Sequence, residues 1–444
     1  MQGRDFSRRG WLIVVLFGLL GQIAWSVENM YFNLFVFETI SPNLDAITLM
    51  VQLSGVVATV ATLFSGTLSD KIGNRRSFIS FGYLIWGVTV AIFGYISPES
   101  VGRLFSLEAE GAITVTLTVV ILADCVMTLF GSTANDAAFN AWVTDNTRAE
   151  FRGKVEGVIA ILPLVAMLIV AGGFGILASA VGYSTLFLLL GILISLCGGV
   201  GLFIIKDSPE LTKSGRLRDI FYGFRPSVVK GNPGLYLSFV ILLIYGIATQ
   251  IYMPYLIIYM KSYLGFTVIE YSLVFGVAIA AGAAINVWLG ILSDKLNKAK
   301  LLYISASVMA AGLFGMYLAR GIEKAPLLIL FGLGGFVMIT GYIFTAALSG
   351  ALVRDYTPEG EAGKLQGVRM VFSVLIPMIV GPMIGNAINR AQGNLLPDAG
   401  ADAMTTSYIP APEIFLTAAV VSLLTLAATP VLLYVTGRAS RKEK

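Results

Sequence analysis

Two short sequence patterns each occur twice in this chain of 444 residues. The string GTLSDK at 66–71 recurs as GILSDK at 290–295, an offset of 224 residues. The string DNT at 145–147 recurs as DYT at 355–357, an offset of 210 residues. Each copy lies between long apolar runs. Because repetition at a large, nearly fixed period indicates duplicated structural units, we predict two related halves in tandem.

The apolar runs are long enough to cross a lipid bilayer. Hydrophobic residues make up 57% of the chain and charged residues only 13%, whereas soluble domains carry about 25% charge. A spanning helix needs about 20 apolar residues, and lipid offers the backbone no hydrogen-bond partners. We therefore predict an all-α integral membrane protein with 12 transmembrane helices in two pseudo-symmetric six-helix bundles. The predicted spans are 11–39, 46–69, 77–96, 112–142, 155–180, 183–205, 235–260, 268–292, 300–319, 326–351, 366–389 and 412–436.

Basic residues are distributed unequally between the two sides of these spans. Of the 30 lysines and arginines, 25 fall in the N-terminus, the even-numbered loops and the C-terminus, and 5 fall in the other loops. The positive-inside rule then places both termini in the cytoplasm of a multi-pass cell-membrane protein. Topology explains this charge, so we expect no nucleic-acid partner. We expect an N-terminal bundle at 1–205, a cytoplasmic linker at 206–232 and a C-terminal bundle at 233–444.

Several kinds of chemistry have no support in the sequence. The chain has no histidine and only two cysteines, Cys125 and Cys197, both inside predicted spans. The commonest metal ligand and a disulfide framework are therefore missing. No phosphate-binding Gly-x-x-x-x-Gly-Lys-Ser/Thr motif is present, which argues against direct use of ATP. We expect no enzyme activity, no cofactor and no metal. The expected partners are a small-molecule solute and the lipid bilayer, and the expected state is a monomer.

The loop GTLSDKIGNRR at 66–76 resembles the signature of the major facilitator superfamily, Gly-x-x-x-Asp-Lys/Arg-x-Gly-Arg-Arg between the second and third helices. Asn74 stands where that family often has an arginine. The resemblance implies the superfamily fold and transport by alternating access. It also implies that the cluster latches the two halves in the outward-facing state, with Asp145 as a candidate partner of the arginines. The matching positions are Gly66, Asp70, Lys71, Gly73, Arg75 and Arg76.

The second copy of this loop is less complete. Gly290 and Asp294 are retained, but the second glycine and the arginine pair are replaced, so we predict a weaker second latch. Further charged residues follow the fourth and tenth spans. The residues predicted to form the conformational latches are Gly66, Asp70, Arg75, Arg76, Asp145, Arg152, Gly290, Asp294 and Asp355.

Ionisable residues inside a span are costly, so each is a candidate for function. Glu28 and Asp124 each lie about twelve residues, or roughly 18 Å, from the outer end of their span. The family resemblance implies that the first and fourth helices line a central cavity, where the two carboxylates would face each other. The structural alternative is that each is held by donors of a neighbouring helix. The predicted substrate- and ion-binding residues are Gln22, Glu28, Asn29, Asp124, Asn135, Asp136, Asn140, Gln250 and Tyr252.

Two further patterns bear on the solute and the coupling ion. Tyr245 and Tyr252 share a helical face with Tyr255 and Tyr259, which suits sugar rings; an aromatic belt at the membrane surface is the alternative for the last two. The string GQIAWSVEN at 21–29 resembles the branch of sucrose and glycoside–cation symporters. The paired aspartates of sodium–melibiose carriers are missing from the second span.

These patterns favour a secondary active transporter that works by alternating access, most simply a proton-coupled symporter of a sugar or glycoside. Without histidine, carboxylates must carry the proton, and Na⁺ could use the same groups. The first alternative is a proton-driven exporter of drugs or other lipophilic solutes. A membrane receptor that transports nothing is the second alternative, and the latch loops argue against it.

Overall fold

The computed structural model describes residues 7–147, 151–208, 217–293, 298–358, 362–395 and 407–442. Among these residues, 12 helical segments are long and apolar enough to cross a membrane, which confirms the predicted number. They are Arg8–Thr39, Leu44–Ile72, Arg75–Phe93, Ala109–Asn146, Lys154–Val181, Tyr183–Ile204, Pro233–Tyr263, Val268–Asn286, Lys300–Leu318, Lys324–Tyr356, Leu365–Gln392 and Glu413–Tyr434.

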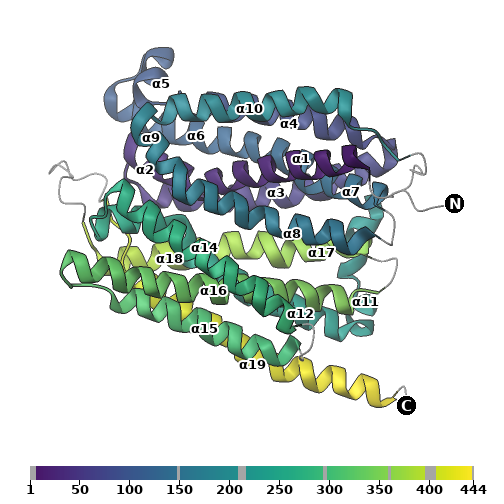
Figure 1. The fold of residues 1–444 in the computed structure, drawn as a ribbon. Coiled ribbons are helices and arrows are strands. Elements are labelled where there is room, and N and C mark those ends of the chain that lie inside the picture. The colour runs from purple at the N-terminus through teal and green to yellow at the C-terminus, as the bar shows by residue number, and fades with distance from the viewer. Residues whose placement is uncertain are drawn as a thin grey trace. The chain divides into compact units, whose positions relative to one another are not determined.

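The chain divides into two compact units (Figure 1). Unit 1 comprises Met1–Pro42 and Val56–Asp219, and unit 2 comprises Asn43–Gly55 and Ile220–Lys444. The second span, α3 (Leu44–Ile72), therefore has its first residues in unit 2 and its remainder in unit 1.

Polar side chains on one face of α3 explain its grouping with unit 2. The Thr48 hydroxyl lies 2.7 Å from the Tyr255 hydroxyl, and the Gln52 side chain donates to the Ile379 carbonyl at 2.9 Å. At the start of the same face, Asp45 pairs with Arg390.

Unit 1 contains five complete spans besides its part of α3. The third and sixth spans, α4 and α10, run side by side (Figure 1) because small residues let their backbones approach. A Cβ atom on Gly87 of α4 would lie 2.3 Å from the Gly191 carbonyl oxygen of α10. The elements are α1 (Arg8–Val27), η1 (Glu28–Phe32), α2 (Asn33–Thr39), α4 (Arg75–Phe93), α5 (Pro98–Phe105), α6 (Ala109–Gly131), η2 (Ser132–Phe139), α7 (Asn140–Asn146), α8 (Arg152–Ile169), η4 (Val170–Phe174), α9 (Gly175–Val181) and α10 (Tyr183–Ile204).

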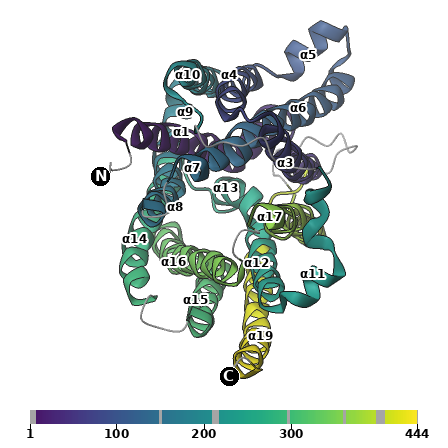
Figure 2. The ribbon, with the colours of Figure 1, turned by 90° about the vertical axis from the view of Figure 1, so that its right-hand side faces the viewer.

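Unit 2 contains the other six spans, preceded by short helical turns. Its ninth and tenth spans, α15 and α16, pack closely (Figure 2), because a Cβ on Gly312 would lie 2.1 Å from the Met338 backbone nitrogen. The elements are η5 (Leu217–Phe224), α11 (Pro226–Gly231), α12 (Pro233–Tyr252), η6 (Met253–Tyr255), α13 (Leu256–Ile258), η7 (Tyr259–Tyr263), α14 (Val268–Ser293), α15 (Lys298–Leu318), α16 (Lys324–Tyr356), α17 (Ala362–Met370), η8 (Val371–Leu375), α18 (Ile376–Gln392) and α19 (Glu413–Lys442).

Several spans contain π-helical turns rather than continuous α-helix. In unit 1 they are η1 in the first span, η2 in the fourth and η4 in the fifth. Such turns are rare and frequently lie at functional sites. Two of the three in unit 1 carry acidic residues: η1 begins at Glu28, and η2 contains Asp136.

Candidate functional site

The first and fourth spans bring three carboxylates together in unit 1. Glu28 and Asp136 are half-buried, and Asp124 is only 2% exposed. Asp124 and Asp136 both lie close enough to repel a charge on Glu28. The structure thus groups three carboxylates that the sequence analysis predicts as binding residues.

Glu28 has one hydrogen-bonded oxygen and one without a partner. The Thr128 hydroxyl, one turn after Asp124 on α6, donates to Oε1 of Glu28 at 3.1 Å. Oε2 of Glu28 is buried and has no hydrogen-bond partner among the described residues. A buried acceptor without a donor is costly when charged. This oxygen is therefore suited to bind a proton or another cation.

The spans of this half contain no basic side chain in the membrane interior. Between Arg9 and Lys206, the lysines and arginines all lie at the ends of spans or in the loops between them. A carboxylate is strongly disfavoured in a low-dielectric interior when no positive charge accompanies it. The charge on Glu28 is therefore best balanced by a cation supplied from outside this half of the chain.

Asp136 belongs to a hydrogen-bonded network with the third span. The Asn135 amide donates to Asp136 Oδ1 at 3.3 Å, and the Tyr83 hydroxyl lies 2.9 Å from Asn135 Oδ1. The absence of a side chain at Gly21 makes room for this network, because a Cβ there would lie 2.5 Å from Asn135 Oδ1. The amide of Asn135 thus bonds within this network, at the π-helical turn η2.

Two tryptophans pack beside the acidic group. The Trp25 and Trp86 rings lie 5.0 Å apart, and Gly131 of the fourth span accommodates both. The indole nitrogen of Trp86 is buried without a hydrogen-bond partner in the described parts of the chain. The indole nitrogen of Trp25 lies near the Asp136 carboxylate without completing a hydrogen bond of normal geometry. The site therefore combines polar atoms that lack full hydrogen bonding with a large aromatic surface.

The predicted amide residues lie around the same helices but are less buried. Gln22 is half-buried, and Asn29 and Asn140 are exposed. The Asn29 amide donates to the Trp25 carbonyl at 2.8 Å, and the Asn140 amide donates to the Asp136 carbonyl at 3.0 Å. The amide oxygens of Asn29 and Asn140 can therefore act as acceptors on the exposed face.

The residues predicted in the seventh span lie in unit 2, in different surroundings. Tyr252 is 1% exposed, and its hydroxyl donates to the Met338 sulfur at 3.3 Å. Gln250 is half-buried and packs against Gly381. Tyr255 and Tyr259 are fully buried in unit 2.

Glu28 and Tyr252 occupy equivalent positions of the sequence repeat, and so do their contact partners Thr128 and Met338. The offset of 224 residues relates Glu28 to Tyr252, and the offset of 210 relates Thr128 to Met338. In each unit these two positions are in contact through their side chains. The acidic site of unit 1 thus has an uncharged counterpart in unit 2.

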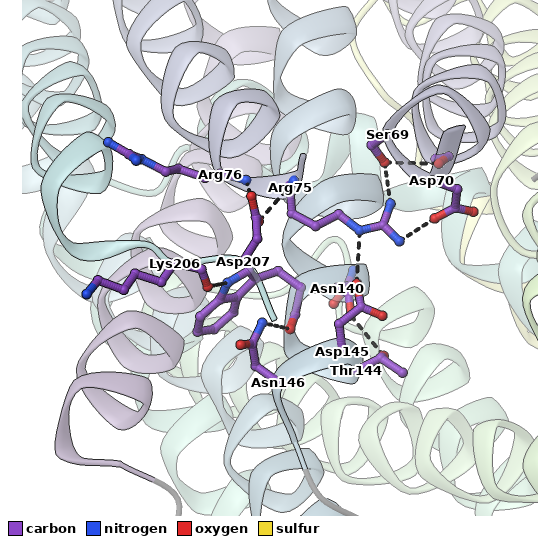
Figure 3. Close-up of polar contacts among 12 residues, drawn as sticks. Ser69, Asp70, Arg75, Arg76, Asn140, Thr144, Asp145, Asn146, Lys206 and Asp207 are labelled. Atoms are coloured by element: carbon purple, nitrogen blue, oxygen red, sulfur yellow. Dashed lines mark hydrogen bonds and ion pairs between the residues drawn. The ribbon is translucent and has the colours of Figure 1, made fainter. Parts of the chain in front are cut away.

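The loop motif at 66–76 forms a cluster around Arg75 in unit 1 (Figure 3). The buried Arg75 side chain pairs with Asp70 and donates through Nε to Asp145 Oδ2 at 3.0 Å. It also donates to the Ser69 hydroxyl at 2.5 Å. The exposed Arg76 donates to the Leu202 carbonyl, so the two arginines have different partners. Gly66 is half-buried, with its carbonyl accepting from Ser69 at 2.9 Å.

Asp207 completes this cluster, although no sequence pattern predicts its role. Its Oδ1 accepts from the backbone nitrogens of Arg75 and Arg76 at 3.0 Å and 2.9 Å. A carboxylate at a helix N-terminus satisfies free backbone donors and complements the helix dipole. The Asp207 position after the sixth span gave no local capping signal, because it is 132 residues from Arg75 in sequence.

The second copy of the motif has a simpler arrangement. Lys298 donates to Asp355 Oδ2 at 2.7 Å, and both side chains are partly exposed. Asp355 is the repeat equivalent of Asp145, and within the described part of this motif its ion pair with Lys298 takes the place of the contact between Arg75 and Asp145. Asp294, the side chain of Arg152 and the surroundings of Gly290 lie outside what the structure describes.

Comparison with known proteins agrees with this architecture. The sequence profile described as "Major Facilitator Superfamily" matches residues 11–382. No curated protein sequence matches the chain. Among solved structures, a mutant of the nucleoside transporter NupG has a TM-score of 0.69 at 12% identity, covering 95% of this chain and 99% of that one. A bacterial homologue of the human lysosomal transporter Spinster, inward-facing and occupied, has a TM-score of 0.68 at 13% identity, covering 97% and 98%.

The profile match extends over most of the chain, and the fold and number of spans agree with it. This protein is a multi-pass membrane transporter, not an enzyme, and it belongs to the major facilitator superfamily.

Proposed function

We propose that this protein is a proton-coupled symporter of a sugar or glycoside, working by alternating access in the cell membrane with both termini in the cytoplasm. Glu28, with Asp124 beside it, carries the proton, and the surrounding amides bind solute hydroxyls. The observation that supports this most is the acceptor atom of Glu28 that has no hydrogen-bond partner among the described residues, in a half whose spans contain no internal lysine or arginine.

A proton is the simplest cation for such a site. One proton converts a carboxylate into a neutral group that also donates a hydrogen bond, which removes the cost of burying charge. Without histidine in the chain, carboxylates are the groups that can exchange a proton near neutral pH. Sodium would need several more oxygen ligands, and no group of three or more acidic, cysteine or histidine side chains among the described residues can hold a metal ion.

The proposed solute class follows from the polar groups near the carboxylates. Gln22, Asn29 and Asn140 present amide groups on partly or fully exposed faces, and such groups pair with hydroxyls. Trp25 supplies a flat apolar surface of the kind that stacks on sugar rings. A nucleoside is itself an N-glycoside, so the solute of the structural neighbour NupG falls within the class proposed here.

Proton coupling through Glu28 can be tested with purified protein in liposomes. In Glu28→Gln, we expect solute accumulation driven by a pH gradient to disappear, while exchange of labelled for unlabelled solute continues. Exchange needs binding and alternating access but no net proton transfer. Glu38→Gln is the matched control, since Glu38 lies in the same span and contacts the exposed Tyr183 hydroxyl. Undiminished accumulation in Glu28→Gln would remove this residue from the coupling role.

The tryptophan pair favours a second candidate function, proton-driven export of lipophilic cations. Trp25 and Trp86 offer aromatic surface beside carboxylates whose own spans contain no internal lysine or arginine. Export and import are distinguished by the pH change that accompanies transport. When solute is added outside cells that contain none, a proton symporter makes the medium more alkaline. An exporter makes the medium more alkaline only when cells preloaded with solute release it.

A further inference from the structure

The segment before the seventh span has one side fixed to unit 2. Ile220 of η5 is buried, and a Cβ on Gly223 would lie 2.5 Å from the Val368 side chain. The Tyr236 hydroxyl of α12 donates to the Gly223 carbonyl. These contacts hold the segment against the ends of α12 and α17.

The other side of the segment is exposed and combines rings with positive charge. Phe221 is 66% exposed and Phe224 is 43% exposed. Arg225 and Lys230 are exposed as well, and neither makes an ion pair with any residue in the described ranges. The Arg225 guanidinium lies 5.4 Å from the Tyr222 ring, which directs it along the surface. We call Phe221, Phe224, Arg225, Val229 and Lys230 the linker face.

The position of the linker face along the chain places it where a span begins. The seventh span starts at Pro233, directly after α11. Residues at such a boundary lie near lipid headgroups, where aromatic rings enter the acyl boundary and basic groups meet phosphates. Residues 206–230 contain six basic and three acidic residues, so the local charge is positive.

We propose that the linker face binds anionic phospholipid headgroups. Phe221 and Phe224 insert at the boundary of the acyl chains, while Arg225 and Lys230 contact headgroup phosphates. Because the opposite side of the segment is bonded to α12 and α17, the bound lipid stabilises these helix ends in unit 2. This proposal depends on the surface of the segment and is independent of the transported solute.

The short helix α5 of unit 1 provides an internal contrast. Its Leu104 is 76% exposed and its Phe105 is 55% exposed, so its apolar exposure matches that of the linker face. However, its only basic residue, Arg103, pairs with Glu99, and two further glutamates follow at 108 and 110. Apolar insertion without available positive charge gives no preference for anionic lipid.

The test compares nanodiscs of pure phosphatidylcholine with nanodiscs containing increasing fractions of phosphatidylglycerol. The thermal unfolding midpoint of the full-length protein is measured against the phosphatidylglycerol fraction. For the unmodified protein we expect a saturable rise that disappears in about 0.5 M salt, because salt screens exposed charges. The variant R225Q/K230Q should need roughly thirtyfold more phosphatidylglycerol for half the rise, since each of the two basic residues contributes about 1 kcal/mol near an anionic surface.

Three further variants separate charge from apolar insertion. F221S/F224S should lower the size of the rise, whereas L104S/F105S and R103Q in α5 should leave the lipid dependence unchanged. All variants should unfold at the unmodified midpoint in pure phosphatidylcholine, which shows that they fold. An unchanged lipid dependence in R225Q/K230Q, or an equal loss in the α5 variants, overturns the proposal. Solute transport is measured in a separate experiment. The lipid dependence of the unfolding midpoint therefore tests this proposal even if the transport experiments contradict the proposed function.

Discussion

Glu28 with Thr128 and Tyr252 with Met338 show how two halves of one duplicated chain have diverged at equivalent positions. In unit 1 a hydroxyl donates to a carboxylate, and in unit 2 a phenol donates to a thioether. The contact between equivalent positions is retained with donor and acceptor exchanged, but only the first pair contains a carboxyl group. The proposed ion coupling therefore depends on a carboxylate that only unit 1 has at this position, and the equivalent contact in unit 2 contains no carboxylate.

The two copies of the loop motif differ as well, and again unit 1 has the more extensive charged interactions. Arg75 is buried and bonded to Asp70, Asp145 and Ser69, whereas Lys298 makes one partly exposed pair with Asp355. Removing one partner from a buried charge network leaves other charges unsatisfied, and removing a surface pair costs little. Among the described residues, unit 1 therefore carries both the group of buried carboxylates and the larger charge cluster.

The largest difference between the halves should appear in stability. We expect Arg75→Gln to lower the free energy of unfolding by about 3 kcal/mol, because Asp70 and Asp145 lose a buried partner. Lys298→Gln should cost less than about 1 kcal/mol. Denaturant titration of the purified protein in detergent measures both values. Similar losses of unfolding free energy in the two variants would mean that the two motif copies contribute equally to stability.

A smaller but more specific difference should appear in coupling. Tyr252→Phe removes a hydroxyl but no ionisable group in the physiological range, so pH-driven accumulation should stay within about threefold of the unmodified protein. Glu28→Gln should reduce it at least roughly tenfold, or ~1.4 kcal/mol. Initial rates of solute entry at several external pH values provide the measurement. Loss of pH dependence in Tyr252→Phe would place coupling in both halves.

The smallest effect concerns the hydrogen-bond partners of Glu28 and Tyr252, which are Thr128 and Met338. Thr128→Val removes one hydrogen bond to Glu28, worth about 1 kcal/mol, so the transport rate should fall by about fivefold. Met338→Leu keeps the volume and should change the rate by less than about twofold. Thr128→Ser, which restores the hydroxyl, should recover most of the rate. If Thr128→Ser and Thr128→Val behave alike, the role of this position is packing and not hydrogen bonding.

Much of the fold was predictable because it depends on local composition. Long apolar runs and the motif at 66–76 are visible in the sequence, and they predict the 12 spans and the family that were found. The π-helical turns were not predictable, because they use the same residue types as an α-helix and differ from it only in the number of residues per turn. Asn135, one of the predicted binding residues, lies in such a turn, since η2 begins at Ser132, and there it bonds to Tyr83.

Long-range pairs were also beyond sequence reasoning. Asp207 caps α4 from the far end of the sixth span, and nothing near residue 207 announces this. The tyrosines of the seventh span were interpreted from their spacing as a sugar-binding face. Their spacing could not reveal that Tyr255 and Tyr259 would be covered by neighbouring helices of unit 2. Spacing along a helix gives a direction for each side chain, while burial depends on what packs there.

The π-helical turn η2 determines the helical register between the two parts of the fourth span that it joins. Asp136 lies within this turn, and Asp145, which binds Arg75, follows nine residues later on the same helix. Deleting a single residue between 132 and 139 would rotate everything downstream by about 100° and shift it by about 1.5 Å. Asp145 would then swing away from its arginine while Glu28 and Thr128 stayed in place. The number of residues in η2 thus sets the orientation of Asp145 and the loop cluster relative to the buried carboxylates of the membrane span.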